Sequence, residues 1–94
     1  MVKPSYHVSM QKSVFSPQQE VLQDLLRQLR QEAGLRQSDL AALLEKPQPF
    51  VSRYEKGEKL LDLPELRQVC HALGVDLVKF VQRYEEALHK AGLD

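Results

Sequence analysis

Cysteine is almost absent from the sequence, tryptophan is absent altogether, and neither sign of charge prevails. The 94 residues include one cysteine, 13 Lys and Arg, and 13 Asp and Glu. A single cysteine excludes a disulfide within the chain and suits the reducing cytoplasm. The three histidines show no metal-ligand spacing with Cys70, so we expect neither a metal site nor a cofactor.

Long apolar runs and catalytic motifs are absent as well. No apolar run approaches the roughly 18 residues of a membrane-spanning helix, and no signal peptide is recognisable. There is no glycine-rich phosphate loop and no nucleophile motif, and Gly34, Gly57 and Gly74 stand where helices should end. These absences predict a cytoplasmic protein that is not an enzyme and does not contact a membrane.

The charges are distributed unevenly along the chain. Residues 27–59 carry seven basic and five acidic side chains, whereas residues 60–94 carry four basic and six acidic ones. The earlier segment is therefore the more positive, although a neutral total is unusual for a nucleic-acid binder. We expect modest non-specific affinity for DNA.

What the sequence does contain is a series of amphipathic helical patterns, which predict an all-α domain over residues 16–91. Ser16 and Gln19 can form a capping box, with Pro17 at the first helical position. An apolar stripe follows, and Gly34 ends this helix. The stripe consists of Leu22, Leu25, Leu26, Leu29 and Ala33.

Two short helices joined by a tight turn form the centre of the chain. The first spans residues 37–44, with Leu40, Leu43 and Leu44 at helical spacing. The second runs from about residue 47 to residue 56, before Gly57. A connection this short is typical of a helix-turn-helix unit.

Two further helices are expected after this unit. Asp62 and Glu65 form a second capping signature, and Asp76 can cap the last helix, over about residues 77–91. Their apolar faces comprise Leu66, Val69, Cys70 and Leu73, then Leu77, Phe80, Val81, Tyr84 and Leu88. Cys70 should be an inert core thiol. Tyr84 and Leu88 either fold back on the first helix or pair with a second copy of the chain, and we favour the dimer.

Residues 1–15 have no helical pattern. Tyr6, Val8 and Met10 alternate with polar residues, which is a weak strand pattern. The segment is either a disordered N-terminal arm or a strand that pairs with its copy in a dimer. As an arm it could also wrap DNA with Lys3 and Lys12.

Four segments together resemble the Xre-type (Cro/cI, lambda-repressor-like) helix-turn-helix family of bacterial and phage DNA-binding proteins. They are LRQLRQEAGLRQSDLA (26–41), PFVSRYEKGE (49–58), LDLPEL (61–66) and ALGV (72–75). They occur in order and at the family's spacing over residues 26–80. The resemblance implies a compact five-helix lambda-repressor-like domain in which the second central helix is the recognition helix.

A recognition helix reads base edges in the DNA major groove through its outward face. With Val51 and Tyr54 directed inward, the candidate base contacts are Gln48, Pro49, Ser52 and Arg53. The guanidinium of Arg53 suits guanine, and the amide of Gln48 suits adenine. Phe50 lies at the margin, where packing is favoured over a contact to thymine.

The resemblance also implies one phosphate contact and one ion pair. Gln37 occupies a position that binds a DNA phosphate in the family, at the start of a helix. An Arg at the place of Arg30 commonly pairs in the family with the Glu that here is Glu55, so we expect a structural pair. By their position, further candidate phosphate contacts are Arg36, Lys46, Lys56 and Lys59, which ordinary solvated charges would also explain.

We therefore predict a sequence-specific transcriptional regulator, a repressor that binds double-stranded DNA as a homodimer on a two-fold-related operator. It would act in the cytoplasm and associate with the nucleoid when bound. One alternative is an antitoxin that represses its own operon and also binds a toxin protein. Another is a protein-interaction module that has kept the fold and lost DNA binding, which the neutral charge and Pro49 would suit.

Overall fold

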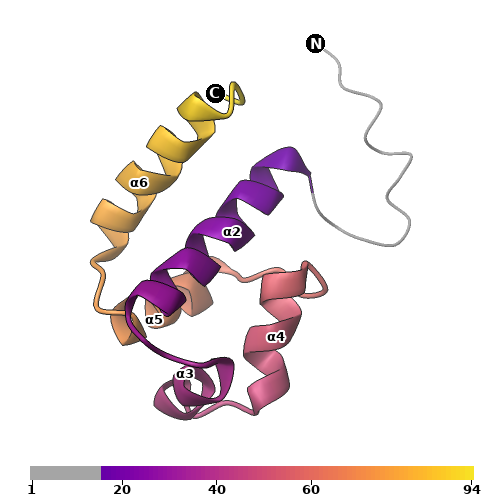
Figure 1. The fold of residues 1–94 in the computed structure, drawn as a ribbon, viewed down its shortest axis with the longest axis vertical. Helices are drawn as coiled ribbons and strands as arrows, with labels where there is room; N and C mark the ends of the chain where they lie inside the picture. The colour runs from indigo at the N-terminus through magenta and orange to yellow at the C-terminus, as the bar shows by residue number, and fades with distance from the viewer. Residues whose placement is uncertain (1–15) are drawn as a thin grey trace.

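The structure, a computed structural model, describes residues 16–94, and these form five helices joined by short connections (Figure 1). The helices are α2 (Pro17–Glu32), α3 (Gln37–Leu44), α4 (Gln48–Lys56), α5 (Leu63–Ala72) and α6 (Leu77–Lys90). The predicted all-α class is confirmed for this part of the chain, in which no helix is long and apolar enough to cross a membrane. The expectations for residues 1–15 lie outside the described residues.

Side-chain caps explain where three of the helices begin. Ser16 Oγ accepts a hydrogen bond from the amide of Gln19 at 3.1 Å. Asp62 accepts from the amide of Glu65 at 2.8 Å, and Glu65 accepts in return from the amide of Asp62 at 3.0 Å. Asp76 caps α6 through its side chain as well. The caps Ser16, Asp62 and Asp76 are confirmed, each satisfying an amide that the first helical turn leaves unpaired, whereas the return bond from the amide of Ser16 to the Gln19 side chain is not found among residues 16–94.

The apolar faces of the helices meet in one core. Helix α2 contacts α4 and α6, α3 contacts α4 and α5, and α5 contacts α6. The most deeply buried side chains are Leu26, Leu40, Val51, Tyr54, Val69, Cys70 and Phe80. Burying a large apolar side chain contributes roughly 1.5–3 kcal/mol. The core, more than the helix propensity of such short segments, therefore holds α3 and α4 in place.

Three residues of the predicted apolar stripes lie at the surface instead. Leu43 is 58% exposed, Val81 is 42% exposed, and Ala33 is exposed just beyond the end of α2. Helical spacing indicates which side of a helix faces the core, but it does not fix how wide a strip of that side the neighbouring helices bury. These three side chains lie outside the buried strip.

The last helix folds back on the first described one. Helix α6 runs beside α2 in Figure 1, and the hydroxyl of Tyr84 donates to the carbonyl of Gln18 at 3.1 Å. Leu88 is only 7% exposed. Both side chains thus contribute to the packing of the monomer, and a dimer contact through them stays a prediction.

Candidate nucleic-acid interface

Helices α3 and α4 form the helix-turn-helix unit, and backbone hydrogen bonds hold the turn between them. The amides of Glu45 and Lys46 donate to carbonyls in the last turn of α3, at 3.1 and 3.0 Å. Glu45 adopts the left-handed conformation, with φ of 57°, which reverses the chain after the helix. Helix α4 begins at Gln48, one residue after the predicted start, with Pro47 as its N-cap.

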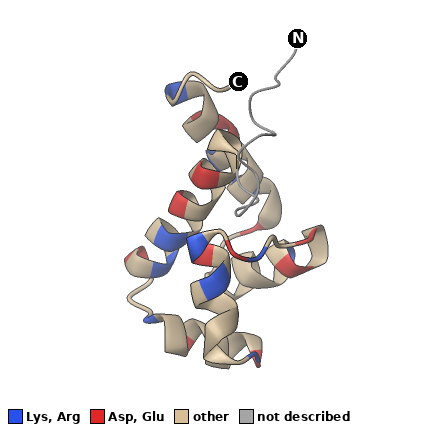
Figure 2. Cartoon of the chain, turned by 90° about the vertical axis from the view of Figure 1, so that its right-hand side faces the viewer, with Lys and Arg blue, Asp and Glu red and all other residues tan. Residues whose placement is uncertain are grey.

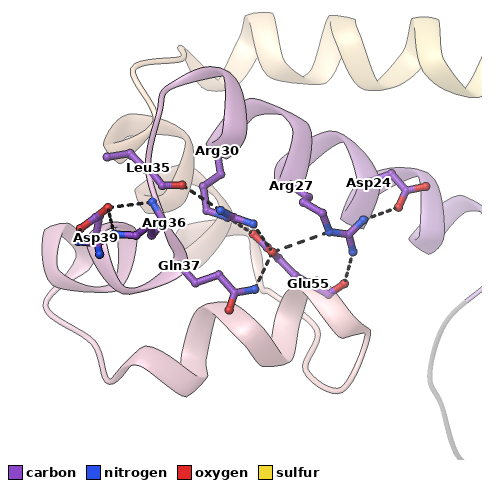
Figure 3. Close-up of polar contacts among 8 residues, drawn as sticks. All are labelled: Asp24, Arg27, Arg30, Leu35, Arg36, Gln37, Asp39 and Glu55. Atoms are coloured by element: carbon purple, nitrogen blue, oxygen red, sulfur yellow. Dashed lines mark hydrogen bonds and ion pairs between the residues drawn. The ribbon is translucent and has the colours of Figure 1, made fainter.

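A buried ion pair fixes α4 to α2. Arg30 Nε and Nη2 donate to Glu55 Oε2 and Oε1 at 2.7 and 3.0 Å (Figure 3). Only 11% of the Arg30 side chain and 2% of the Glu55 side chain are exposed. The hydrogen bond to Glu55 is the main reason why the pKa of Arg30 lies above its ordinary value. The predicted pair is thus present, in the two-pronged geometry that gives the strongest contacts of this kind.

Glu55 has two further partners that sequence reasoning missed. Arg27 Nη2 donates to the backbone carbonyl of Glu55 at 2.9 Å, and Gln37 Nε2 donates to Glu55 Oε1 at 3.0 Å (Figure 3). An amide nitrogen carries two hydrogens. Gln37 can therefore bind Glu55 and a phosphate oxygen at once, so its expected phosphate contact stays a prediction with a suitable geometry.

The outward face of α4 carries the four candidate base contacts. Gln48, Pro49 and Arg53 are exposed and Ser52 is half-buried, while Val51 on the opposite side is 0% exposed. The hydroxyl of Ser52 donates to the carbonyl of Pro49 at 3.2 Å. Ser52 is therefore the least available of the four, and Gln48 and Arg53 are the best placed to reach base edges. Their base contacts stay predictions.

Arg36 makes a local contact at the start of α3. Its Nε and Nη2 donate to the carboxylate of Asp39 at 3.0 Å each, and its amide donates to the same carboxylate at 2.9 Å. These hydrogen bonds, that of the guanidinium above all, lower the pKa of Asp39 to about 2. Asp39 thus satisfies the backbone amide of Arg36, whereas the side chain of Arg36 has no acceptor and cannot cap the amides of the first turn of α3. To contact a phosphate, the guanidinium of Arg36 would have to break its hydrogen bonds to Asp39 or bind the phosphate with its remaining hydrogens.

The three candidate lysines differ in their partners. Lys59 Nζ lies 3.3 Å from the Glu65 carboxylate and donates to the carbonyl of Leu60 at 3.3 Å. Lys46 and Lys56 are exposed and form no ion pair with any residue from 16 to 94. Figure 2, which faces the α4 side of Figure 1, shows both signs of charge interspersed there. The chain as a whole has no basic excess of the kind that strong non-specific binders carry.

Phe50 lies between these lysines and the core. Its ring meets that of Tyr54 edge-on, with 5.7 Å between centroids, and packs against the buried cluster. The ammonium groups of Lys46 and Lys59 lie 5.3 and 5.5 Å from the centroid of the Phe50 ring. The expected packing role is confirmed, whereas the contacts with the two lysines were not predicted.

Two titratable groups, Tyr54 of α4 and Cys70 of α5, are buried in the core. Burial raises the pKa of Tyr54, and its hydroxyl has no hydrogen-bond partner among the described residues. Cys70 is 0% exposed, and burial raises the pKa of its thiol to about 11. The expected burial of Cys70 is confirmed, and a thiol in this state is a weak nucleophile.

One buried polar residue escaped the apolar pattern. Gln23 is 6% exposed and lies against the C-terminal end of α4, where a Cβ added to Gly57 would approach Gln23 Nε2 to 2.6 Å. Gly57 has φ of 84°, so the left-handed end of α4 and the close approach of Gln23 both favour glycine here. In the sequence, Gly57 indicated only the end of the helix, so the contact with Gln23 was not predicted.

Residues 26–80 match the model of the helix-turn-helix family. No curated protein matches the chain. Among solved structures, the chain is 38% identical to an XRE-family like protein from Pseudomonas syringae pv. tomato str. DC3000. The match has a TM-score of 0.70 and covers 73% of this chain and 84% of that protein.

Two further structures with named roles share the fold. The clp gene regulator ClgR from Corynebacterium glutamicum is 25% identical, with a TM-score of 0.71 and 82% of each chain covered. The restriction-modification controller protein C.Esp1396I, solved as a tetramer in complex with its natural 35-base-pair operator, is 22% identical. Its TM-score is 0.73, with 79% of this chain and 97% of that protein covered, and at this identity the likeness shows the fold alone.

Proposed function

The chain belongs to the Xre-type helix-turn-helix family of DNA-binding transcriptional regulators, and we propose that it is a sequence-specific repressor. It would bind as a homodimer to a two-fold-related operator in double-stranded DNA and block access of the polymerase. Repression of this kind takes place in the cytoplasm, with the protein associated with the nucleoid while bound.

The observation that carries this proposal is the way in which α4 is displayed. Its exposed face presents Gln48 and Arg53, whose side chains match the donor and acceptor patterns of adenine and guanine. The C-terminal end of α4 is fixed to α2 through Glu55, because the guanidinium of Arg30 donates two hydrogen bonds to the Glu55 carboxylate. A helix held rigidly at one end, with polar readers on its outward side, meets the geometric need of major-groove readout.

The dimer follows from the size of a single reading surface. One short recognition helix reaches only a few base pairs, and dimers of this fold class place two such helices about 34 Å apart, one turn of the duplex. C.Esp1396I, which has the same fold, binds its operator as a tetramer. This supports testing whether more than one copy of the present chain binds to one operator.

The proposal is tested by selecting bound sequences from random duplex DNA at about 150 mM salt, with non-specific competitor present. We expect enrichment of a two-fold-symmetric motif whose half-sites are centred about one helical turn apart. Enrichment of a single half-site would contradict the dimer, and no enrichment would contradict sequence-specific binding. Placing the selected motif between a promoter and a reporter gene then distinguishes repression from activation.

No contact within residues 16–94 and no comparison favours the two alternatives. A toxin partner has no support in either, and the exposed readers on α4 favour DNA binding over a module that has lost it.

A further inference from the structure

Phe50 brings together two lysines that lie on opposite sides of α4 in the sequence. Lys46 precedes the helix and Lys59 follows it, yet their ammonium groups lie 5.3 and 5.5 Å from the same ring centroid. Both distances fall within the roughly 6 Å over which a cation is attracted to an aromatic ring. The ring itself is fixed from behind, because it packs edge-on against the buried Tyr54.

This arrangement limits how far apart the two cations can be. The sum of the two distances, about 11 Å, is the greatest separation that the ammonium groups can have. The major groove is about 12 Å wide. The two cations are therefore close enough to bind phosphates along the same short stretch of duplex.

Both ammonium groups keep donors for a phosphate. A lysine ammonium has three hydrogens. Lys59 directs its hydrogens to the carbonyl of Leu60 and to Glu65 Oε1, each at 3.3 Å, which leaves one. Lys46 is exposed and has no ion-pair partner within residues 16–94. The aromatic ring neutralises neither charge, so Lys46 is restrained with its full charge available, whereas Lys59 also has the carboxylate of Glu65 beside it.

We propose that Phe50 is a positioning residue whose ring holds Lys46 and Lys59 together as one phosphate clamp beside the recognition helix. The inference rests on the proposed DNA binding and goes beyond it, since it assigns a role in affinity to a side chain that contacts neither base nor phosphate. Because the ring restrains the two lysines before DNA arrives, less side-chain freedom is lost when they bind.

The test is a double-mutant cycle between Phe50→Leu and the pair Lys46→Ala and Lys59→Ala, measured as affinity for a duplex from 50 to 200 mM salt. Leucine keeps apolar bulk at the site and removes the ring. In the wild-type background, loss of both lysines should lower the slope of log affinity against log salt by about 1.8. Phe50→Leu alone should weaken binding to all sequences alike by about threefold to tenfold at 50 mM salt. Once the lysines are gone, it should cost almost nothing more.

Two controls separate positioning from general damage. Phe50→Tyr keeps the ring and should retain the wild-type affinity, whereas Phe50→Met should behave as Phe50→Leu does. Lys56→Ala removes a lysine that has no contact with the ring, so its effect should simply add to that of Phe50→Leu. Thermal melting identifies any variant that fails to fold. If either Phe50→Leu or Phe50→Met fails, the other substitution is used for the double-mutant cycle.

Additive effects of Phe50→Leu and the lysine pair would overturn the proposal, as would a change in base preference at one position, which would make Phe50 a reader. Failure of the proposed function is distinguishable from both, because it would appear as absent sequence preference in the wild type. The cycle can still be measured then on any duplex held by phosphate contacts.

Independently of DNA, NMR should show the resonances of the ε-methylene protons of Lys46 and Lys59 shifted upfield by the Phe50 ring. The shift should disappear in Phe50→Leu, and unshifted protons in the wild type would contradict the proposal.

Discussion

At the scale of single residues, Glu55 is the side chain on which the interface depends most. Its carboxylate binds the guanidinium of Arg30 and the amide of Gln37, and its backbone carbonyl accepts from Arg27. With 2% of its side chain exposed, Glu55 has little access to water that could replace these partners. One residue thus joins α2, the start of α3 and the end of α4.

Replacing Glu55 by Gln should lower the free energy of unfolding by roughly 3 kcal/mol. Breaking a buried pair leaves the remaining charge, here that of Arg30, without compensation, which costs more than the pair itself is worth. The measurement is urea unfolding of the two proteins.

Glu32→Gln is the matched control for this substitution. Glu32 lies 3.9 Å from Arg83, and both side chains are about half exposed, at 53% and 43%. An exposed pair contributes little, so this variant should stay within about 0.5 kcal/mol of the wild type. Equal losses in the two variants would show that burial does not strengthen the Glu55 contacts.

Sequence reasoning reached the Arg30–Glu55 pair only through the family resemblance. No local pattern connects two residues that are 25 positions apart, and nothing in the spacing indicated that Arg27 would bind a carbonyl of the same residue. Long, flexible side chains choose among partners that only the folded chain brings near. The same reason explains why the grouping of Lys46, Phe50 and Lys59 was not predicted.

At the scale of elements, the helix-turn-helix unit contains two left-handed helix ends that differ in residue type. Helix α3 ends at Glu45, with φ of 57°, and α4 ends at Gly57, with φ of 84°. The left-handed conformation costs a residue with a Cβ roughly 1–2 kcal/mol, whereas glycine adopts it freely. The first end is therefore strained and the second is relaxed.

Glu45→Gly should raise the free energy of unfolding by up to about 1 kcal/mol. Relief of the left-handed strain outweighs the greater freedom that glycine has in the unfolded chain. Thermal or urea unfolding measures the gain, and a loss of stability would mean that Glu45 makes a contact that compensates for its conformation.

Gly57→Ala should have the opposite effect, a loss of roughly 1–2 kcal/mol. The new Cβ would have to tolerate φ of 84° and would also lie 2.6 Å from Gln23 Nε2. Gly34→Ala is the control, since Gly34 has φ of 74° and open space around the position of a Cβ. If Gly34→Ala cost as much as Gly57→Ala, the contact with Gln23 would contribute nothing.

The elements themselves were largely predictable, because their signals are local. Ser16, Asp62 with Glu65, and Asp76 occupy the predicted caps, and Gly57 ends α4 as expected. What local signals could not give was the extent of each buried face. Leu43 and Val81 share the spacing of core residues, yet the helices of residues 16–94 leave them largely exposed.

At the scale of the whole molecule, the single thiol reports on whether the core is closed. Cys70 is 0% exposed in the folded chain, and its pKa rises from 9.0 to about 11. Near pH 8 the folded chain therefore holds about a hundredfold less thiolate than a free cysteine would.

The reaction of Cys70 with an aromatic disulfide reagent near pH 8 should accordingly follow the unfolding of the domain. We expect slow labelling in native buffer and rapid labelling above the urea midpoint, with the labelling rate tracking the fraction unfolded. Rapid labelling of the native protein would show that α5 opens without global unfolding.

The charge of the whole molecule, by contrast, pointed away from the conclusion. Equal numbers of acidic and basic residues argue against a nucleic-acid binder, and Figure 2 shows both signs on the α4 side. Family membership and the display of α4 outweigh this, because specific readout depends on a few placed side chains more than on total charge. A weak non-specific background is what such a surface should produce.

The most direct test of sequence reading by α4 is the base-preference profile of Arg53→Ala beside that of the wild type, on the selected operator and all its single-base variants. Arg53 is exposed on the outward face of α4, so its loss should cost roughly 1–3 kcal/mol and relax preference at one base pair of each half-site. Lys56→Ala, the neighbouring exposed cation, should weaken binding to all variants alike and lower the salt slope by about 0.9. A profile that Arg53→Ala leaves unchanged would contradict the assignment of Arg53 as a base-reading residue of α4.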